Sequence, residues 1–528
     1  MIRFILMSNS NIKTDVLVIG SGLAGCAAAW AAAGRGAEVA MITRAGEAEQ
    51  SNTFWAQGGI IYEGKHDSPE ALVKDILVAG AGLSSPEAAR LLSREGPRLV
   101  KEILIDELHV DFDRAPDGSG DWHLTAEAAH SLPRILHHKD QTGSAIERVF
   151  LERVARHPKV KLMAGTTAVD LLTPSHHSEE PRDVYKPLTC VGSYVLHQPS
   201  NEVFPMLAKE TILATGGLGR VYLHTTNPPG AVGGGIAMAS RAGARCINMQ
   251  YVQFHPTTLY HPSGRFLISE ALRGEGARLV DSRGREFMQR FHPDGSLAPR
   301  DVTARAIYQL MLESGEPCAY LDIAYKPADE VRDRFPGIYA HCLELGIDIT
   351  KQPIPVVPAA HYSCGGIAVN EWGETNLLRL RAVGEVSCTG LHGANRLAST
   401  SLLECLVWGT RAGSAAAEAA LRGGGCDMPR IIPWRYEHEA VDPALIAQDW
   451  LTIQQTMWNY VGLIRSEKRL NRAYEILREL DVEISRFYEK AEVTDAIIGL
   501  RNGIQTARVL LLAAKECRQS RGCHYRVD

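Results

Sequence analysis

Five short polar clusters between residues 253 and 396 carry side chains suited to binding a small anion. Arginine binds a carboxylate through a bidentate contact, and histidine can donate a hydrogen bond without carrying charge. Each cluster alone also has an ordinary structural interpretation, such as a loop histidine, an exposed Arg-Asp pair or a helix cap. Together they offer two or three cations, two imidazoles and few free carboxylates, which suits a small dianion. The clusters are Gln253-Phe-His255-Pro-Thr257, Ser269-Glu270 with Arg273, Arg300-Asp301, His361-Tyr-Ser-Cys-Gly-Gly366 and His392-Gly-Ala-Asn-Arg396.

The residues before position 45 predict a βαβ unit that binds a dinucleotide. A buried strand, Val16–Ile19, runs into a turn with glycines at 20, 22 and 25. An alanine-rich helix, Cys26–Ala33, and a second apolar strand, Val39–Ile42, follow. Gly20 allows the tight bend, Gly22 lets the backbone approach a pyrophosphate, and Gly25 lets helix and strand pack closely. The second strand ends in Thr43-Arg44, where an NAD site would carry an acid, so the motif leaves NAD and FAD open.

Composition excludes several classes of protein. The 528 residues are 45% hydrophobic and 22% charged, with a net charge of −5, as expected of a globular protein that binds neither nucleic acid nor an anionic membrane. Eleven scattered cysteines without a Cys-x-x-Cys pair favour reduced thiols and a cytoplasmic location. No apolar run is long enough to span a membrane, and no metal-ligand spacing occurs. Met1–Met7 is expected to be a loose extension.

The order of the predicted strands and helices indicates an α/β fold. It consists of a Rossmann-like dinucleotide-binding domain, interrupted by an α+β capping domain and followed by a helical C-terminal domain. The predicted boundaries are 1–245 and 359–424 for the two parts of the first domain, 246–358 for the capping domain and 425–528 for the helical domain. Such layouts usually place the active site between domains. Further predictions are helices at Pro69–Ala79, Pro86–Ile105, Thr142–Arg156, Ile236–Ala242 and Leu391–Gly409, strands at Val160–Met163 and Glu210–Gly217, and a surface excursion at 173–188.

The C-terminal part is expected to be helical from Gly423–Gly425 to its end. Apolar residues recur there at helical spacing in two stripes, which are interpreted as core. The stripes are Trp450, Ile453, Met457, Tyr460, Val461 and Ile464, and Ile497, Leu500, Ile504, Ala507, Leu511 and Ala514.

Over almost its whole length the chain resembles the fumarate reductase/succinate dehydrogenase flavoprotein group, and within it the branch that oxidises L-aspartate. So many motifs in order make chance similarity implausible. They are Gly20-Ser-Gly-Leu-Ala-Gly25, Thr53-Phe-Trp-Ala-Gln-Gly-Gly59, Ile212-Leu-Ala-Thr-Gly-Gly217, Gln253-Phe-His-Pro-Thr257, Glu270-Ala-Leu-Arg-Gly-Glu-Gly-Ala277, Leu297-Ala-Pro-Arg-Asp301, His361-Tyr-Ser-Cys-Gly-Gly366, Gly384-Glu-Val-Ser-Cys-Thr-Gly-Leu-His-Gly-Ala-Asn-Arg396, Ser399-Thr-Ser-Leu-Leu-Glu404 and Ser520-Arg-Gly-Cys-His-Tyr525.

The resemblance implies FAD as the cofactor and a set of residues around it. Gly20, Ser21, Gly22, Leu23, Ala24 and Gly25 form the pyrophosphate turn, and Arg44 meets the adenosine half. The flavin is wrapped by Asn52, Thr53, Phe54, Trp55, Ala56, Gln57, Gly58 and Gly59. Glu385 binds ribitol or ribose hydroxyls, and Ser401 and Leu402 line the isoalloxazine edge.

The resemblance also implies how a dicarboxylate is held. His255, Ser269 and Arg300 bind it on one side, and His361 and Arg396 on the other. Glu127 meets the substrate ammonium, which favours aspartate over succinate. Arg300 occupies the place of the family's proton-handling arginine, with purely electrostatic placement as the alternative role.

The implied reaction is hydride transfer from Cα of L-aspartate to flavin N5, giving iminoaspartate. The reduced flavin is reoxidised by O2, giving H2O2, or by fumarate. The imine passes to quinolinate synthase, so the reaction is the first step of de novo NAD biosynthesis. No partner surface for that handover is visible in the sequence, and neither is the oligomeric state.

The chain departs from the family's pattern at two places. Gly233-Gly234-Gly235 replaces the usual Gly-Asp-Gly, so a carboxylate near FAD is missing and FAD is expected to be held less tightly. Glu127-Ala-Ala-His130 replaces Glu-Gly-Gly-His, and two alanines stiffen a loop that needs glycine freedom. Ser269 stands where threonine is common and keeps the hydroxyl.

Two alternatives remain at this point. The first is a fumarate reductase or succinate dehydrogenase subunit. Respiratory members attach FAD through a histidine, but this chain has Asn52 between Ser51 and Thr53, so FAD binding would be non-covalent. The second is a flavin-binding scaffold without turnover, suggested by Gly234 and by Ala128-Ala129.

Overall fold

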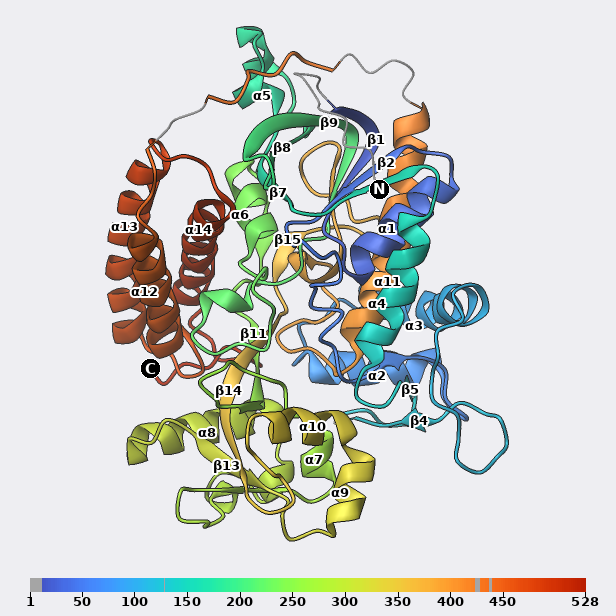
Figure 1. The fold of residues 1–528 in the computed structure, drawn as a ribbon, viewed down its shortest axis with the longest axis vertical. Helices are drawn as coiled ribbons and strands as arrows, with labels where there is room; N and C mark the ends of the chain where they lie inside the picture. The colour runs from blue at the N-terminus through green and yellow to red at the C-terminus, as the bar shows by residue number, and fades with distance from the viewer. Residues whose placement is uncertain (1–11, 128, 423–427, 436–438) are drawn as a thin grey trace.

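A computed structural model describes residues 12–127, 129–422, 428–435 and 439–528. Figure 1 shows a central α/β body, a smaller sheet with helices at its lower end, and helices from the C-terminal part along one flank. The predicted extension Met1–Met7, Ala128 and the expected helix start at Gly423–Gly425 lie outside the described residues.

A seven-stranded sheet organises the central body. Its order is β6-β2-β1-β9-β8-β7, and β16 also pairs with β9. β1, β2, β6, β9 and β16 run parallel, while β8 runs antiparallel to both of its neighbours, β7 and β9. The α/β prediction is therefore confirmed, and the predicted strands at 39–42 and 160–163 have the observed bounds. The strands are β1 (Ile12–Ile19), β2 (Val39–Ile42), β6 (Val160–Met163), β7 (Thr166–Leu171), β8 (Gly192–His197), β9 (Glu202–Leu213) and β16 (Leu380–Ala382).

Two helices pack closely against this sheet, α1 (Leu23–Gly34) and α11 (Thr400–Arg422). Glycines of α11 allow the two helices to lie close to each other, since a Cβ at Gly413 of α11 would lie 2.1 Å from the carbonyl oxygen of Ala28 of α1. The prediction that a helix opens at Leu391 was wrong by nine residues. Residues 391–399 form turns with buried side chains, and Ser399 has a positive φ of 56° that a helix does not accommodate.

Helices α2 (Pro69–Ala79) and α4 (Thr142–Ala155) match their predictions. The helix predicted at Pro86–Ile105 is α3 (Pro86–Leu99), continued by a π-helix over Val100–Glu107. Pro97 lacks the backbone N–H that a regular α-helix needs at that position, which is a physical reason for the change of helix type. Three short strands, β3 (Ile60–Ile61), β4 (Leu124–Thr125) and β5 (Ile135–Leu136), form a small antiparallel sheet beneath these helices.

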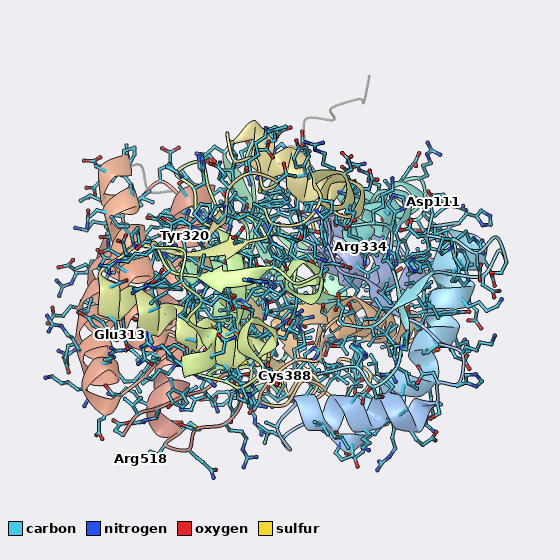
Figure 2. The ribbon with its side chains drawn as sticks, turned by 90° about the horizontal axis from the view of Figure 1, so that it is seen from below. Asp111, Glu313, Tyr320, Arg334, Cys388 and Arg518 are labelled. Carbon is cyan, nitrogen blue, oxygen red and sulfur yellow. The ribbon has the colours of Figure 1, made fainter. Side chains whose placement is uncertain are left out.

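A second sheet, of order β11-β14-β13-β12, is antiparallel. Figure 2 shows it from below, with Tyr320 of β13 and Glu313 of α8 labelled. Its long strands β11 and β14 reach up into the central body. The elements are β11 (Val252–Leu259), α7 (Ala271–Gly274), β12 (Arg278–Val280), α8 (Arg300–Ser314), β13 (Ala319–Asp322), α9 (Ala328–Arg334), α10 (Pro336–Glu344) and β14 (Ile354–Ser363).

Shorter elements join the two sheets. The predicted helix at 236–242 is α6 (Gly234–Arg241). Strands β10 (Cys246–Ile247), β15 (Gly366–Ala368) and β17 (Ser387–Cys388) form a three-stranded sheet. The excursion at 173–188 contains the short helices α5 (Pro174–His177) and Pro181–Tyr185, with Tyr185 88% exposed.

The flanking helices are α12 (Pro443–Val461), α13 (Glu467–Tyr488) and α14 (Asp495–Glu516). Both apolar stripes pack into the core as predicted, with Ile453, Met457, Leu500 and Ile504 fully buried. The prediction that the chain is helical to its end was wrong. The residues after α14 turn back, and the backbone of Arg526 forms an isolated parallel β-bridge with that of Arg465. Among the described helices, none combines the length and apolarity needed to cross a membrane.

Candidate active site

The turn between β1 and α1 leaves room for a bound anion. Gly20 has φ +120°, and a Cβ there would lie 2.1 Å from the carbonyl oxygen of Ala214. Gly22 caps α1 without a side-chain hydrogen bond. The N–H of Leu23 donates to Oγ1 of Thr53 at 3.1 Å. The other N–H groups of this first turn are the kind of donor that a pyrophosphate site requires.

This turn opens into a cavity of about 2010 Å³, much larger than an ordinary small-molecule pocket. It has room for an extended dinucleotide together with a substrate. Every predicted site residue lines it except Gly25. A Cβ at Gly25 would lie 2.1 Å from the carbonyl oxygen of Gly20, so Gly25 allows helix and strand to pack and does not itself line the cavity.

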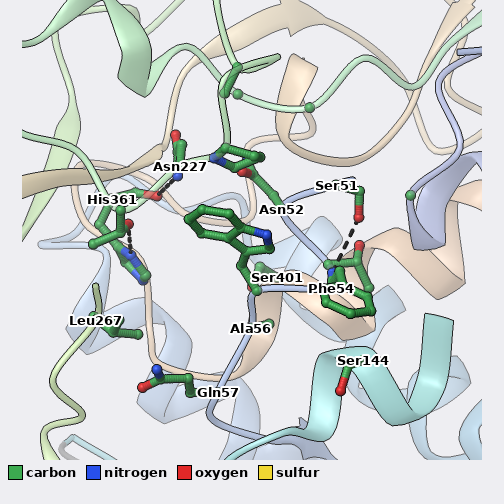
Figure 3. A pocket seen from close by; sticks show the side chains of 18 of the residues that line it. Ser51, Asn52, Phe54, Ala56, Gln57, Ser144, Asn227, Leu267, His361 and Ser401 are labelled. Carbon is green, nitrogen blue, oxygen red and sulfur yellow. Dashed lines mark hydrogen bonds between the residues drawn. The ribbon is translucent and has the colours of Figure 1, made fainter. Parts of the chain in front are cut away.

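The loop from Ser51 to Gly59 forms one wall of the cavity (Figure 3). Asn52 donates to Glu385 at 2.8 Å, and the backbone N–H of Ser363 donates to the same carboxyl group at 2.9 Å. Burial raises the pKa of Glu385 to about 7, although these hydrogen bonds oppose the shift. Glu385 is thus fixed at the cavity wall, and its carboxyl group changes its protonation state near neutral pH.

Several polar atoms of the cavity wall have no hydrogen-bond partner among the described residues. The side-chain oxygens of Asn52, Gln57 and Thr215 are buried and unpaired. Unpaired buried acceptors are costly in a finished interior. A ligand rich in hydrogen-bonding groups, such as the isoalloxazine and ribitol of FAD, fits this wall.

Two histidines approach each other across the paired strands β11 and β14. The ring centroids of His255 and His361 lie 5.5 Å apart. Thr226 lies 2.8 Å from Nδ1 of His361, and Asn227 donates to its backbone carbonyl at 3.1 Å (Figure 3). Burial and neighbouring arginines hold both histidine pKa values well below 6.5. Both imidazoles are therefore neutral at physiological pH.

Arg300, the first residue of α8, is held by a carboxylate. Its Nε donates to Glu270, and Glu270 also accepts from Arg273 at 2.8 Å. Burial would lower the pKa of Arg300, but the negative charges of Glu270 and Glu127 outweigh burial and raise it. The same two arginines outweigh burial at Glu270 and lower its pKa. Arg300 is thus a fixed cation, and Ser269 precedes Glu270 at the same wall.

Arg396 supplies the second cation, from the turn before α11. It donates to Gln253 and to Ser401, each at 3.1 Å, and its guanidinium lies 4.6 Å from the centroid of the Tyr362 ring. Its Nε is buried and has no partner among the described residues. That unused donor fits an oxygen of a bound carboxylate.

Glu127 lies in the cavity wall and, unlike Glu270, forms no ion pair with an arginine among the described residues. It accepts from Ser399 at 2.9 Å, and a Cβ at Gly58 would lie 2.8 Å from its Oε1. Ala129 has φ +68°, the left-handed conformation that glycine adopts without strain. The substitution noted from the sequence therefore falls where glycine would relieve strain.

The sequence interpretation missed some lining residues, and one histidine of its polar clusters does not line the cavity. Asp495, Ile498 and Asn502 of α14 line it, although they lie far along the chain. His392 does not line it but pairs with Glu404 at 2.9 Å behind the wall. The positions 495, 498 and 502 share one helix face, the only sequence signal that could have found them.

Comparisons with known proteins identify the family. Residues 15–402 match the FAD binding domain family, and residues 450–528 match the fumarate reductase flavoprotein C-terminal family. The fold and the cavity thus define an FAD-dependent oxidoreductase of the fumarate reductase/succinate dehydrogenase flavoprotein superfamily. Within it, the chain belongs to the L-aspartate oxidase family.

Relatives named L-aspartate oxidase match almost the whole chain. One from Pseudomonas aeruginosa is 44% identical over 98% of this chain and 96% of its own length. One from Yersinia pestis is 42% identical over 99% and 97%, and a chloroplastic one from Arabidopsis thaliana is 39% identical over 100% and 83%. The resemblance stated from the sequence motifs is confirmed.

Solved structures share the same fold. A quinol fumarate reductase chain from E. coli superposes with a TM-score of 0.86 at 26% identity, covering 98% of this chain and 92% of that chain. Mycobacterium smegmatis Sdh1 in complex with UQ1 gives a TM-score of 0.81 at 30% identity, covering 98% and 89%.

Proposed function

We propose that the protein oxidises L-aspartate to iminoaspartate, using non-covalently bound FAD, with Asn52 at the position of the histidine that carries the covalent link in respiratory relatives. The observation that carries this proposal is the charge pattern of the cavity. Two fixed arginines, Arg300 and Arg396, line it together with the acid Glu127, which bonds Ser399. The other acid beside them, Glu270, is already bonded to Arg300 and Arg273. Two cations fit two carboxylates, and one acid fits an ammonium group.

Two groups of side chains would hold the substrate carboxylates. His255, Ser269 and Arg300 bind one carboxylate, and His361 and Arg396 bind the other. The neutral imidazoles donate hydrogen bonds without adding positive charge to the cavity. The negative charge of Glu127 therefore faces no further cations from these histidines. Holding both ends orients Cα and converts a bimolecular encounter into an oriented step.

FAD, when bound, supplies the hydride acceptor. The residues proposed to hold it are the Gly20–Ala24 turn, Arg44, the Asn52–Gly59 loop, Glu385, and Ser401 with Leu402. Glu127 would bind the substrate ammonium, and this ammonium must lose a proton before oxidation, because only the neutral amine can form an imine. Arg300 is proposed to be the proton-handling residue of the site. Its raised pKa keeps it charged, which favours the alternative role of electrostatic placement of the substrate.

The wider context belongs to the same proposal. O2, giving H2O2, or fumarate would reoxidise the reduced cofactor. Iminoaspartate would pass to quinolinate synthase as the first step of NAD biosynthesis. The ten described cysteines are all free, which supports the reducing environment of a cytoplasm.

Product analysis tests this proposal. Purified protein with FAD, L-aspartate and O2 should form H2O2 and an imine that hydrolyses to oxaloacetate and ammonia in equal amounts. D-aspartate and L-glutamate are the matched controls and should give no more than traces. The same products from glutamate, or none from L-aspartate, would overturn the assignment. Fumarate formed from succinate at a higher rate would favour a succinate dehydrogenase.

A further inference from the structure

The cofactor cavity lacks an acid at two places where one is expected. In dinucleotide-binding βαβ units an acid near the end of the second strand binds a ribose hydroxyl. Here β2 ends at Ile42 and the chain continues with Thr43 and Arg44. The family resemblance implies an aspartate near FAD at the position of Gly234, so a second acid is missing as well.

A carboxylate from the far end of the chain lies at this place. Asp495, the first residue of α14, accepts from Nη2 of Arg44 at 2.6 Å and from Oγ1 of Thr167 at 2.7 Å. Gln198 donates both to Thr167 at 2.9 Å and to the backbone carbonyl of Arg44 at 2.7 Å. The carboxylate is therefore held from several sides and is not a freely moving surface group.

One face of α14 spans both positions that lack an acid. Asp495, Ile498 and Asn502 line the same cavity as the Gly20–Ala24 turn. A Cβ at Gly499 would lie 3.4 Å from Nη2 of Arg44, and a Cβ at Gly234 would lie 3.5 Å from Nδ2 of Asn502. The first two turns of α14 thus cover the end of β2 and the start of α6 together.

We propose that Asp495 is the carboxylate that binds the adenosine ribose hydroxyls of FAD. Each carboxylate oxygen has more than one acceptor site, so both can accept a hydroxyl while bonded to Arg44 and Thr167. The side chain remains 32% exposed, toward the cavity that it lines. Arg44 neutralises its charge, which reduces repulsion with the nearby pyrophosphate.

This assignment gives the helical C-terminal part a direct role in holding the cofactor. Arg44 then positions Asp495 and is not the sole contact with the adenosine half. Because Asp495 lies 451 residues from Arg44 in sequence, bound FAD would join α14 to the βαβ unit. The inference concerns cofactor recognition and does not depend on which substrate is oxidised.

Competitive binding tests the proposal on the full-length protein stripped of FAD, with FAD fluorescence as the readout. ADP, 2′-deoxy-ADP and 3′-deoxy-ADP each compete with FAD for the adenosine end of the cavity, and no amino acid is present. The wild type should bind ADP about tenfold more tightly than the 2′-deoxy or the 3′-deoxy analogue. Equal affinity of the wild type for all three nucleotides would overturn the proposal without any variant.

Asp495→Asn should weaken FAD binding about tenfold and abolish the preference for ADP. A purely structural role would weaken ADP and its deoxy analogues alike and leave their ratio unchanged, which would contradict the proposal. Adding Gly234→Asp to Asp495→Asn should recover most of the affinity and the preference. The control is Glu492→Gln, which alters an exposed acid near the start of the same helix and should change neither quantity.

Discussion

Arg300 and Glu270 form a partly buried ion pair in which Glu270 also bonds Arg273. Replacing the acid by its amide keeps the shape but removes the charge that fixes Arg300. We predict that Glu270→Gln slows anaerobic flavin reduction by L-aspartate by about 10–100-fold, since preorganised charge contributes most at the reacting carbons. Stopped-flow absorbance measures this rate.

The matched control for that variant is Glu313→Gln on α8, the helix that begins at Arg300. Glu313 pairs with Arg290 at 3.0 Å on the exposed surface (Figure 2). Its replacement should leave the reduction rate within twofold of the wild type. An unchanged rate in Glu270→Gln would show that Arg300 does not need its carboxylate partner.

Glu127 should discriminate the amino diacid from the plain diacid. We predict that Glu127→Gln lowers the apparent affinity for L-aspartate at least tenfold, because the ammonium loses its counter-charge. Binding of succinate, measured by its perturbation of the flavin spectrum, should stay the same or become tighter. Equal losses for both ligands would mean that Glu127 supports the loop and does not recognise the amine.

Glu147 should make stability depend on pH. Burial raises its pKa from 4.5 to about 8, despite the hydrogen bond from Ser51 at 2.6 Å. Between these values the folded protein keeps a proton that the unfolded chain has lost. Stability therefore falls as pH rises through this window and levels off above it.

Glu147→Gln removes this dependence. The free energy of unfolding of the variant, relative to the wild type, should rise from pH 5 to pH 8, by at most about 1.4 kcal/mol for each pH unit. Chemical denaturation at several pH values measures it. Glu152→Gln, an exposed acid on the same helix α4, should show a flat difference. A flat difference for Glu147→Gln as well would contradict the buried neutral carboxyl.

Ala129 should tolerate glycine unusually well. Its φ of +68° costs an L-residue about 1 kcal/mol, and glycine relieves this while losing more backbone entropy on folding. Ala129→Gly should therefore leave the free energy of unfolding within about 0.5 kcal/mol of the wild type. At the exposed helical position Ala419 the same change should cost up to about 1 kcal/mol. Comparable losses at the two sites would indicate that residue 129 carries no strain.

The part of the site that is local in sequence could be predicted from sequence. The turn at Gly20–Gly25 joins a strand and a helix that are neighbours in the chain. Its glycines indicate directly where the backbone bends tightly or packs closely. Contacts between distant segments gave no such signal. Asp495 reaches Arg44 only because α14 packs against the central body, and the apolar stripe that predicts this packing lies on another face of the helix.

Boundaries were harder to predict than elements. The helix α11 begins at Thr400 rather than Leu391 because the intervening turns bury Arg396 and aim it at the cavity. The proton states of His255 and His361 follow from burial among arginines, which a sequence cannot reveal. The division into a capping domain at 246–358 and a helical domain from 425, and the role of each site residue, stay predictions.

Single-turnover reduction of the bound flavin under anaerobic conditions tests the central claim most directly. The wild type is mixed with saturating L-aspartate or with saturating succinate, and the loss of flavin absorbance is followed. A cavity with two fixed arginines and the acid Glu127 should bleach rapidly with L-aspartate and at least 100-fold more slowly with succinate. A flavin that L-aspartate leaves oxidised but succinate reduces would contradict the account.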